Sequence, residues 1–179
     1  MLPCDGMAGM YPAESCKDPA FDLTEEVVRK FGSVRLRLMG TSMVPSILPG
    51  DLVTIRHAGL NEIYPGEVIL FSREGGFAAH RVVTRRGTSA EPYLITRGDR
   101  LLHDDSPVFS SALLGRVESI ERNGYRVQTA GRLSIWQRCV ARLLRFSDTA
   151  TYFYLRLVSV CGRLSYGDRN ASRENCHIS

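Results

Sequence analysis

The chain of 179 residues has the length of about one domain, since domains commonly hold roughly 100–200 residues. Apolar residues make up 44% and charged residues 23%, which argues against disorder throughout, a collagen-like repeat and a protein with many membrane spans. The net charge of +4 is concentrated in residues 131–179, which carry +5, whereas residues 1–33 carry −3. This mild charge suits an anionic membrane surface or an acidic partner better than nucleic acid, and it also fits ordinary solvated arginines.

The first part of the chain, residues 1–33, predicts a flexible leader and a short helix. Residues 1–20 mix Pro, Gly, Ser and acidic residues without periodicity. A helical pattern follows, with Asp22 or Thr24 as its cap and Gly32 at its end. The leader lacks the basic and apolar segments of a secretory signal, and no run of 18 apolar residues predicts a transmembrane anchor. We therefore expect a cytoplasmic or peripheral membrane protein.

Residues 34–129 predict an antiparallel β domain. Short runs rich in branched and aromatic residues alternate with turn residues, and no helical pattern separates the runs, so a parallel α/β fold is disfavoured. Asn123-Gly124 is typical of a type I′ hairpin turn, and Glu74-Gly75-Gly76 indicates a second hairpin. Seven strands are expected, in the order VRLRL, LVTIRH, EVILFS, FAAHRVVT, YLITR, LLGRVESIER and YRVQT.

Residues 130–179 predict an amphipathic helical extension and a polar tail. Two faces recur at helical spacing, Ile135, Cys139 and Leu143 on one and Arg138, Arg142 and Arg145 on the other. Ser147-Asp148-Thr149 offers a break and the cap of a second helix. The extension could lie on a membrane surface, with Trp136 and the aromatic residues 152–154 on its apolar side, or pack on the β domain or on a second copy. The pattern leaves the oligomeric state open.

The sequence predicts no cofactor and no metal ion. No Gly-rich phosphate loop of standard spacing occurs, which leaves nucleotide binding unsupported. The cysteines lie far apart, without a CxxC pair or a histidine at ligand spacing, so neither a zinc site nor a disulfide framework is indicated. We expect reduced thiols at Cys4, Cys16, Cys139, Cys161 and Cys176.

Two residues of the β domain could carry chemistry, His80 and Ser42. His80 is the one histidine inside an apolar strand-like run, although such a histidine is more often a hydrogen-bonded core residue than a base. Ser42 follows Gly40 and Thr41 at a turn that opens the β domain, where backbone N–H groups can face a carbonyl. An acyl-transfer nucleophile requires such donors nearby.

Five sequence blocks, in order, resemble the signal peptidase I superfamily of serine proteases, which includes the self-cleaving repressors of the SOS type. The blocks are GTSMVPSILPGDLV from Gly40, GEVILF from Gly66, AHRVV from Ala79, LITRGDRLLHDD from Leu94 and LLGRV from Leu113. The resemblance covers about residues 38–128 and implies a signal-peptidase-like β-fold with a serine endopeptidase activity. Its implied substrate is an extended precursor peptide with small side chains before the scissile bond.

The superfamily uses either a lysine or a histidine as its general base, and this chain is similar to the histidine branch. Both lysines, Lys17 and Lys30, precede Ser42, so no lysine stands at the downstream position of the lysine branch. Arginine cannot replace lysine there because its guanidinium stays protonated. His80, in the AHRVV block, matches the histidine of the other branch.

The resemblance implies a Ser-His-Asp mechanism in that chain order. Ser42 would be the nucleophile and His80 the base, and Asp105 would orient the imidazole. Asp99 is the second candidate for the acid and could instead hold its own loop, and Asp104 is a rival because it adjoins Asp105.

Two further interpretations stay open beside the protease. A repressor-like module would dimerise or sense a partner, but residues 1–33 are too short to supply a helix-turn-helix. A non-catalytic peptide-binding module would keep Ser42 and His80 as structural polar residues, out of hydrogen-bond reach of each other.

Gly40 stands where many signal peptidases have a serine that assists the oxyanion hole, so only backbone donors are expected there.

Overall fold

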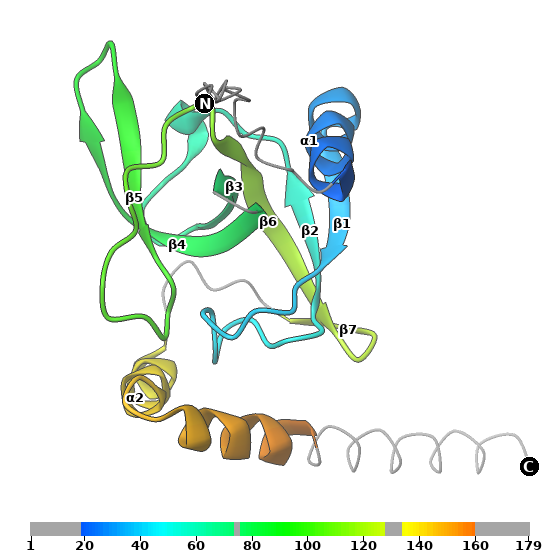
Figure 1. Cartoon of the computed structure of the whole chain (residues 1–179), viewed down its shortest axis with the longest axis vertical. Coiled ribbons are helices and arrows are strands. Elements are labelled where there is room, and N and C mark those ends of the chain that lie inside the picture. The colour runs from blue at the N-terminus through cyan, green and yellow to red at the C-terminus, as the bar shows by residue number, and fades with distance from the viewer. Residues whose placement is uncertain (1–18, 74–75, 128–133, 160–179) are drawn as a thin grey trace, which may run out of the picture.

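The computed structural model describes residues 19–73, 76–127 and 134–159. These residues form a mainly β protein, with seven antiparallel strands in one sheet, a helix before the sheet and two helices after it (Figure 1). The fold class expected from the sequence is therefore confirmed. Most of the expected leader, residues 74–75 of one expected hairpin and the expected polar tail lie outside the described residues.

All seven strands lie where the sequence predicts them, with ends that differ by no more than three residues. The elements are α1 (Pro19–Phe31), β1 (Ser33–Arg37), β2 (Leu52–Arg56), the short 3-10 helix η1 (Leu60–Glu62), β3 (Val68–Arg73), β4 (Gly76–Gly87), β5 (Pro92–Arg97), β6 (Leu113–Arg122), β7 (Tyr125–Val127) and α2 (Ile135–Leu144). A second C-terminal helix is described over residues 148–159.

The strand order is β1-β2-β6-β3-β4-β5, and β7 pairs with β6. All of these pairs are antiparallel. Strand β6 comes late in the sequence but lies between β2 and β3 in the sheet (Figure 1). It therefore joins β1 and β2 to the other half of the sheet, which is made of β3, β4 and β5.

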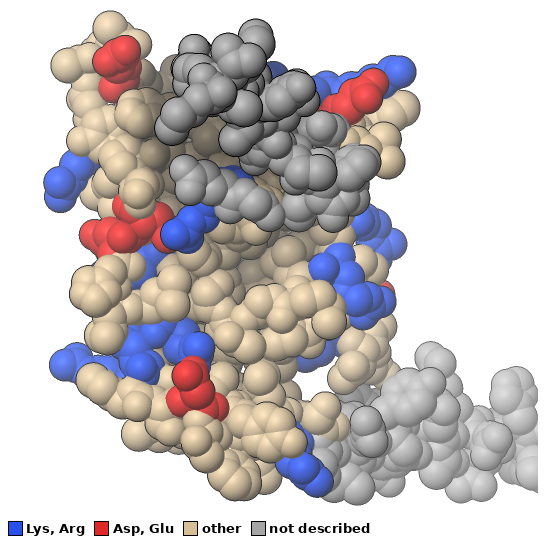
Figure 2. Space-filling model, in the orientation of Figure 1, with Lys and Arg blue, Asp and Glu red and all other residues tan. Residues whose placement is uncertain are grey.

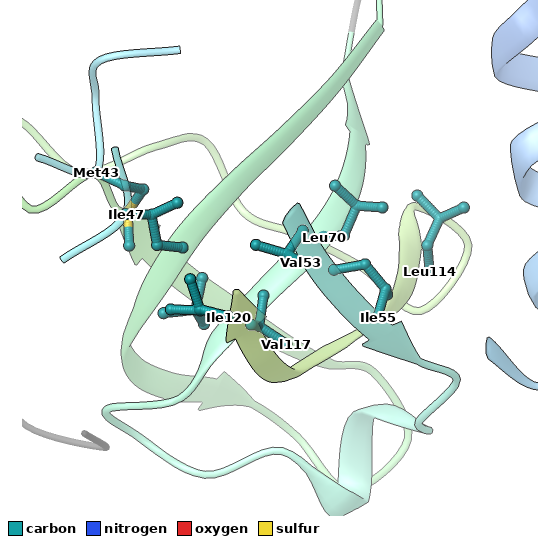
Figure 3. Close-up of a cluster of buried hydrophobic side chains, with 9 residues drawn as sticks. Met43, Ile47, Val53, Ile55, Leu70, Leu114, Val117 and Ile120 are labelled. Atoms are coloured by element: carbon teal, nitrogen blue, oxygen red, sulfur yellow. The ribbon is translucent and has the colours of Figure 1, made fainter. Parts of the chain in front are cut away.

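Strand β3 is buried on both of its faces. Val68 and Leu70 belong to one core cluster, and Ile69 and Phe71 belong to another. Successive side chains of a strand point to opposite faces, so an apolar run such as VILF is what a strand with two covered faces requires. Figure 3 shows the first cluster, which also contains side chains of the loop between β1 and β2.

The Asn123-Gly124 turn confirms the predicted hairpin. Both residues have positive φ angles, 52° at Asn123 and 80° at Gly124, as a type I′ turn requires. Arg122 pairs with Tyr125 directly across the turn.

Helix α1 begins earlier than the sequence predicts. It starts at Pro19, so Asp22 and Thr24 lie inside the helix and the prediction that either caps it is wrong. Proline is favoured in the first helical turn because its fixed φ suits a helix and its missing N–H has no partner to lose there. The end is as expected, since the helix stops at Phe31 and the Gly32 N–H donates to the Val28 carbonyl at 3.0 Å.

The C-terminal helices pack on the loop between β1 and β2. Helix α2 begins at Ile135, after the capping residue Ser134, whose hydroxyl accepts from the Gln137 N–H. The break before the second helix falls at residues 145–147. Of the predicted break, only Ser147 lies in it, and its hydroxyl accepts from the Ala150 N–H, whereas Asp148 and Thr149 belong to the second helix. Leu144 is buried against Val44 and Leu48 of the loop. In the described part of the chain, every helix is too short or too polar to cross a bilayer.

Candidate active site

Ser42 lies in the loop of residues 38–51 between β1 and β2, and this loop is anchored on two sides. Met43 and Ile47 point into the core of the sheet (Figure 3). Val44 and Leu48 pack on the C-terminal helices. All four residues lie directly after Ser42, so the backbone that follows Ser42 is held by two different parts of the fold.

His80 projects from strand β4 beside this loop. The residue is 4% exposed, its backbone pairs with Ile69 of β3, and its ring lies edge-on to Phe71 with the centroids 6.0 Å apart. His80 Nε2 is 3.0 Å from Ser42 Oγ, a hydrogen-bond distance. Two residues 38 positions apart in the sequence are thus brought into direct contact.

Asp105 lies on the other side of the imidazole. Its Oδ2 atom is 2.6 Å from His80 Nδ1 and also accepts from the Thr96 hydroxyl at 2.7 Å. The Asp105 N–H donates to the Thr96 carbonyl at 2.8 Å, and Arg73 Nη1 is 3.7 Å from Asp105 Oδ1. The carboxylate is therefore fixed through both its side chain and its backbone, and its side chain is only 9% exposed.

This arrangement determines which ring nitrogen carries the proton. An ionised carboxylate only accepts hydrogen bonds, so His80 Nδ1 is the donor to Asp105. In the neutral ring Nε2 then has a free lone pair that accepts from the Ser42 hydroxyl. A serine hydroxyl placed in this way can be deprotonated as it attacks a carbonyl carbon.

The other two candidate acids have different partners. Both oxygens of Asp99 are occupied by Arg81, with Nε to Oδ1 at 2.8 Å and Nη2 to Oδ2 at 2.9 Å, and the Ser46 hydroxyl also donates to Oδ2. Asp104 is half exposed and forms an ion pair with Arg97 at 3.2 Å. Of the three aspartates, only Asp105 has its carboxylate hydrogen-bonded to the His80 imidazole.

Two arginine–aspartate pairs hold the Ser42 loop in place through hydrogen bonds to Ser46. Arg81 bonds both Asp99 and the Ser46 hydroxyl, the latter at 3.1 Å. Arg122 bonds both oxygens of Asp51, at 2.9 and 2.7 Å, and donates to the Ser46 carbonyl at 3.2 Å. We call these five residues the loop clamp. Its aspartates are buried, with Asp51 3% and Asp99 6% exposed, so the pairs are shielded from solvent.

The turn at Gly98 touches Ser42 directly. The Arg100 N–H donates to the Ser42 carbonyl at 2.9 Å, and a Cβ atom on Gly98 would lie 2.8 Å from that same oxygen. Glycine is therefore needed for the backbone to approach this closely. The Arg100 side chain continues to Asp148 at 2.8 Å and Thr151 at 2.9 Å, which links the turn to the second C-terminal helix.

Two groups where the C-terminal helices meet the domain have shifted pKa values. Burial, with Arg97 and Arg142 nearby, lowers the pKa of Arg145, and Asp99 partly opposes this shift. Burial raises the pKa of Tyr154 above its ordinary value, while Arg122 acts in the other direction. Both shifts reflect partial removal of these side chains from water.

A groove of about 750 Å³ adjoins Ser42 and His80. Its walls are mainly apolar and include Leu36, Leu38, Met39, Phe77, Ala78 and Ala79. Strand β4 pairs with β3 along residues 76–81, but with β5 only from Arg81 onward. Within the described chain, no strand pairs with residues 78–80 on the side away from β3, so an extended peptide could pair there.

Sequence reasoning missed several residues that support this site. Thr96, Arg73, Arg81 and Ser46 were not singled out, although each contacts a candidate residue. The alternation of strand β5 could have indicated that Thr96 is buried, but it carries no information about the bond to Asp105. Among the described residues, no group of three His, Cys, Asp or Glu side chains is placed to hold a metal ion.

An antiparallel β domain that brings a serine, a histidine and an aspartate into hydrogen-bond succession has the architecture of a peptidase-type domain. The chain belongs to the Peptidase S24-like family, whose model matches residues 7–98. The superfamily predicted from the five sequence blocks is thereby confirmed, and the choice of its histidine branch stays a prediction. The family includes serine peptidases and non-catalytic members such as repressors. A search of curated proteins found no match.

Proposed function

We propose that this chain is a serine endopeptidase of the signal-peptidase type that cleaves an extended precursor peptide by a Ser-His-Asp mechanism. One observation carries the proposal: His80 lies within hydrogen-bond distance of both Ser42, at 3.0 Å, and Asp105, at 2.6 Å. A non-catalytic peptide-binding module would not require this contact, and no observation favours the repressor-like alternative.

In the first half of the reaction, Ser42 Oγ attacks the scissile carbonyl carbon while its proton passes to His80 Nε2. The tetrahedral intermediate collapses when His80 returns the proton to the departing amine, and an ester to Ser42 remains. Asp105 holds the imidazole in its orientation and stabilises the imidazolium that forms between the two proton transfers.

In the second half, a water molecule replaces the amine. His80 takes a proton from the water molecule as the water oxygen attacks the ester carbon. His80 then gives this proton to Ser42 Oγ, and the acyl group leaves as a carboxylic acid. The negative charge on the carbonyl oxygen is stabilised in both halves by backbone N–H groups, including that of Ser42. Gly40 supplies no side-chain donor.

The groove indicates how the substrate is presented. A peptide strand paired with residues 78–80, on the side away from β3, would run past His80 and reach Ser42. The family resemblance implies small side chains just before the scissile bond. We infer that the substrate must be extended and unfolded at the cleaved bond, because only such a segment can pair with a strand edge.

The proposal is tested by comparing protein N-termini across the proteome in source cells that express either the wild-type chain or Ser42→Ala at equal levels. New N-termini should occur with the wild type and be absent with Ser42→Ala and with His80→Ala. Ser110→Ala, a change at an exposed serine, is the matched control and should leave the profile unchanged. Identical profiles for the wild type and Ser42→Ala would contradict the protease and support a binding module.

A further inference from the structure

The two C-terminal helices carry an unusual amount of exposed apolar surface. Of fifteen large apolar side chains exposed in the described residues, seven lie in residues 134–159. Three of the most exposed are Ile135 at 81%, Phe146 at 77% and Trp136 at 75%. We call the set the outer helix face: Ile135, Trp136, Leu143, Phe146, Tyr152, Phe153 and Leu157. Single exposed apolar residues need no explanation, whereas several large apolar side chains exposed on two neighbouring helices are typical of a binding surface.

Packing among the described residues does not account for the outer helix face. Both helices use their opposite side for that purpose, since Ala141, Leu144 and Thr151 are buried and the helices share one apolar cluster with Val44 and Leu48. The outer helix face therefore points away from the sheet, at the end of the molecule where both helices lie (Figure 1). No described residue of the chain covers it.

The charge around this face is positive. Residues 134–159 contain four arginines and one aspartate, a net charge of +3. The aspartate, Asp148, is already paired with Arg100 at 2.8 Å, while Arg138, Arg142 and Arg156 are exposed. Figure 2 shows this end of the molecule as mainly uncharged surface with basic side chains beside it. The combination of aromatic and aliphatic side chains with neighbouring arginines is typical of helices that lie in an anionic membrane interface.

We propose that the outer helix face docks this protein on the surface of an anionic lipid bilayer. Association with a second copy through this face would bring the exposed arginines of both copies together, which is unfavourable, whereas anionic headgroups would neutralise them. The docking is independent of the proposed peptidase activity, because none of its residues belongs to the Ser42, His80 and Asp105 arrangement.

The chain contains its own probe for this interaction, because Trp136 is its only tryptophan and is 75% exposed. Full-length protein is titrated with vesicles of phosphatidylglycerol and phosphatidylcholine, and with vesicles of phosphatidylcholine alone. We expect the Trp136 emission to shift to the blue with the anionic vesicles and to be quenched when their acyl chains carry bromine. The binding should weaken as salt screens the arginines.

Matched variants separate this face from general surface charge. Arg138→Gln with Arg142→Gln should weaken binding by about tenfold or more, since each basic residue near an anionic surface contributes about fivefold. Arg86→Gln with Arg126→Gln removes the same charge from exposed positions on β4 and β7 and should have little effect. Leu143→Ser with Phe146→Ser should also weaken binding, while the exposed Tyr64→Ser should not. Circular dichroism verifies that each variant is folded.

Three results would overturn the proposal. The first is no emission shift with anionic vesicles for a folded wild-type chain. The second is an equal loss of binding in the Arg138 and Arg142 variant and in the Arg86 and Arg126 variant. The third is a dimer in lipid-free solution that dissociates on Leu143→Ser with Phe146→Ser, which would assign the outer helix face to a second copy.

Discussion

At the scale of single residues, the partners of Asp105 decide the chemistry that this site supports. Its Oδ2 atom accepts from His80 Nδ1 and from the Thr96 hydroxyl, and its backbone N–H is also held by Thr96. A carboxylate in this position orients the imidazole and stabilises its protonated form. The neighbouring Asp104 has the same charge but contacts Arg97 at the surface.

Replacing Asp105 tests this assignment. Asp105→Asn should lower kcat by about 10³–10⁴-fold, because an amide that donates to Nδ1 favours the tautomer in which Nε2 cannot accept from Ser42. Asp104→Asn is the matched control and should change kcat by less than about twofold, as expected for an exposed ion pair. Steady-state cleavage of a peptide identified from the cellular N-termini measures both. Equal effects of the two substitutions would contradict the assignment.

At the same scale, Asp99 supports the Ser42 loop through its ion pair with Arg81. Asp99→Ala leaves Arg81 without the carboxylate that neutralises it, and the Arg81 side chain is only 13% exposed. We expect the free energy of unfolding to fall by about 3–5 kcal/mol, the usual effect of breaking a buried pair on one side. Urea denaturation measures the change.

The surface pair of Arg35 and Glu121 provides the comparison. Its side chains are 57% and 42% exposed, so Glu121→Ala should cost less than about 1 kcal/mol. If Asp99→Ala were no more destabilising than Glu121→Ala, the loop clamp would not stabilise the fold.

At the scale of elements, the site depends on how the C-terminal helices and the sheet share one loop. The loop of residues 38–51 places Met43 and Ile47 in the sheet core and Val44 and Leu48 against the helices. The helices are therefore part of the support of Ser42, although they lie far from it in the sequence.

Two neighbouring leucines of α2 test this support. Leu144 is 3% exposed and packs with the loop, whereas Leu143 is 70% exposed on the outer helix face. Leu144→Ala should lower the free energy of unfolding by about 2–5 kcal/mol through lost burial and a cavity. Leu143→Ala should stay within about 0.5 kcal/mol of the wild type. Equal destabilisation in chemical denaturation would show that α2 is not packed as described.

At the scale of the whole molecule, no described strand pairs with residues 78–80 of β4 on the side away from β3, beside the candidate active site. Residues 76–80 of β4 pair with β3, while β5 begins its pairing with β4 at Arg81. The groove along this edge leads to Ser42 and His80. Under the proposed function, a substrate strand would pair with residues 78–80 on this side.

Backbone methylation of a cleaved peptide tests this binding mode. In a paired strand only alternate amides point toward the neighbouring strand, so N-methyl groups at those positions should raise KM by about fivefold or more, as expected from a lost hydrogen bond and a steric clash. Methyl groups at the intervening amides should have a smaller effect. A peptide that is insensitive at every position, or equally sensitive at all of them, would exclude strand pairing.

The sequence by itself determined the local features of this protein. The seven strands follow from short runs rich in β-branched and aromatic residues between turn residues, and the Asn123-Gly124 turn follows from residues that accept positive φ angles. Both signals depend only on near neighbours in the chain. The family blocks also singled out Ser42, His80 and Asp105, which the structure brings together. The start of α1 could not be predicted as well, because more than one residue near a helix end can begin the helix.

Only the tertiary structure decided how distant segments meet. Three contacts join residues from different strands and loops. Thr96 donates to Asp105, Arg81 and Arg122 donate to Ser46, and Gly98 approaches the Ser42 backbone. The structure also decided that α2 packs through Leu144 and leaves Ile135 exposed. The helical period identifies apolar positions, but which of them is buried depends on the surface that the rest of the chain presents.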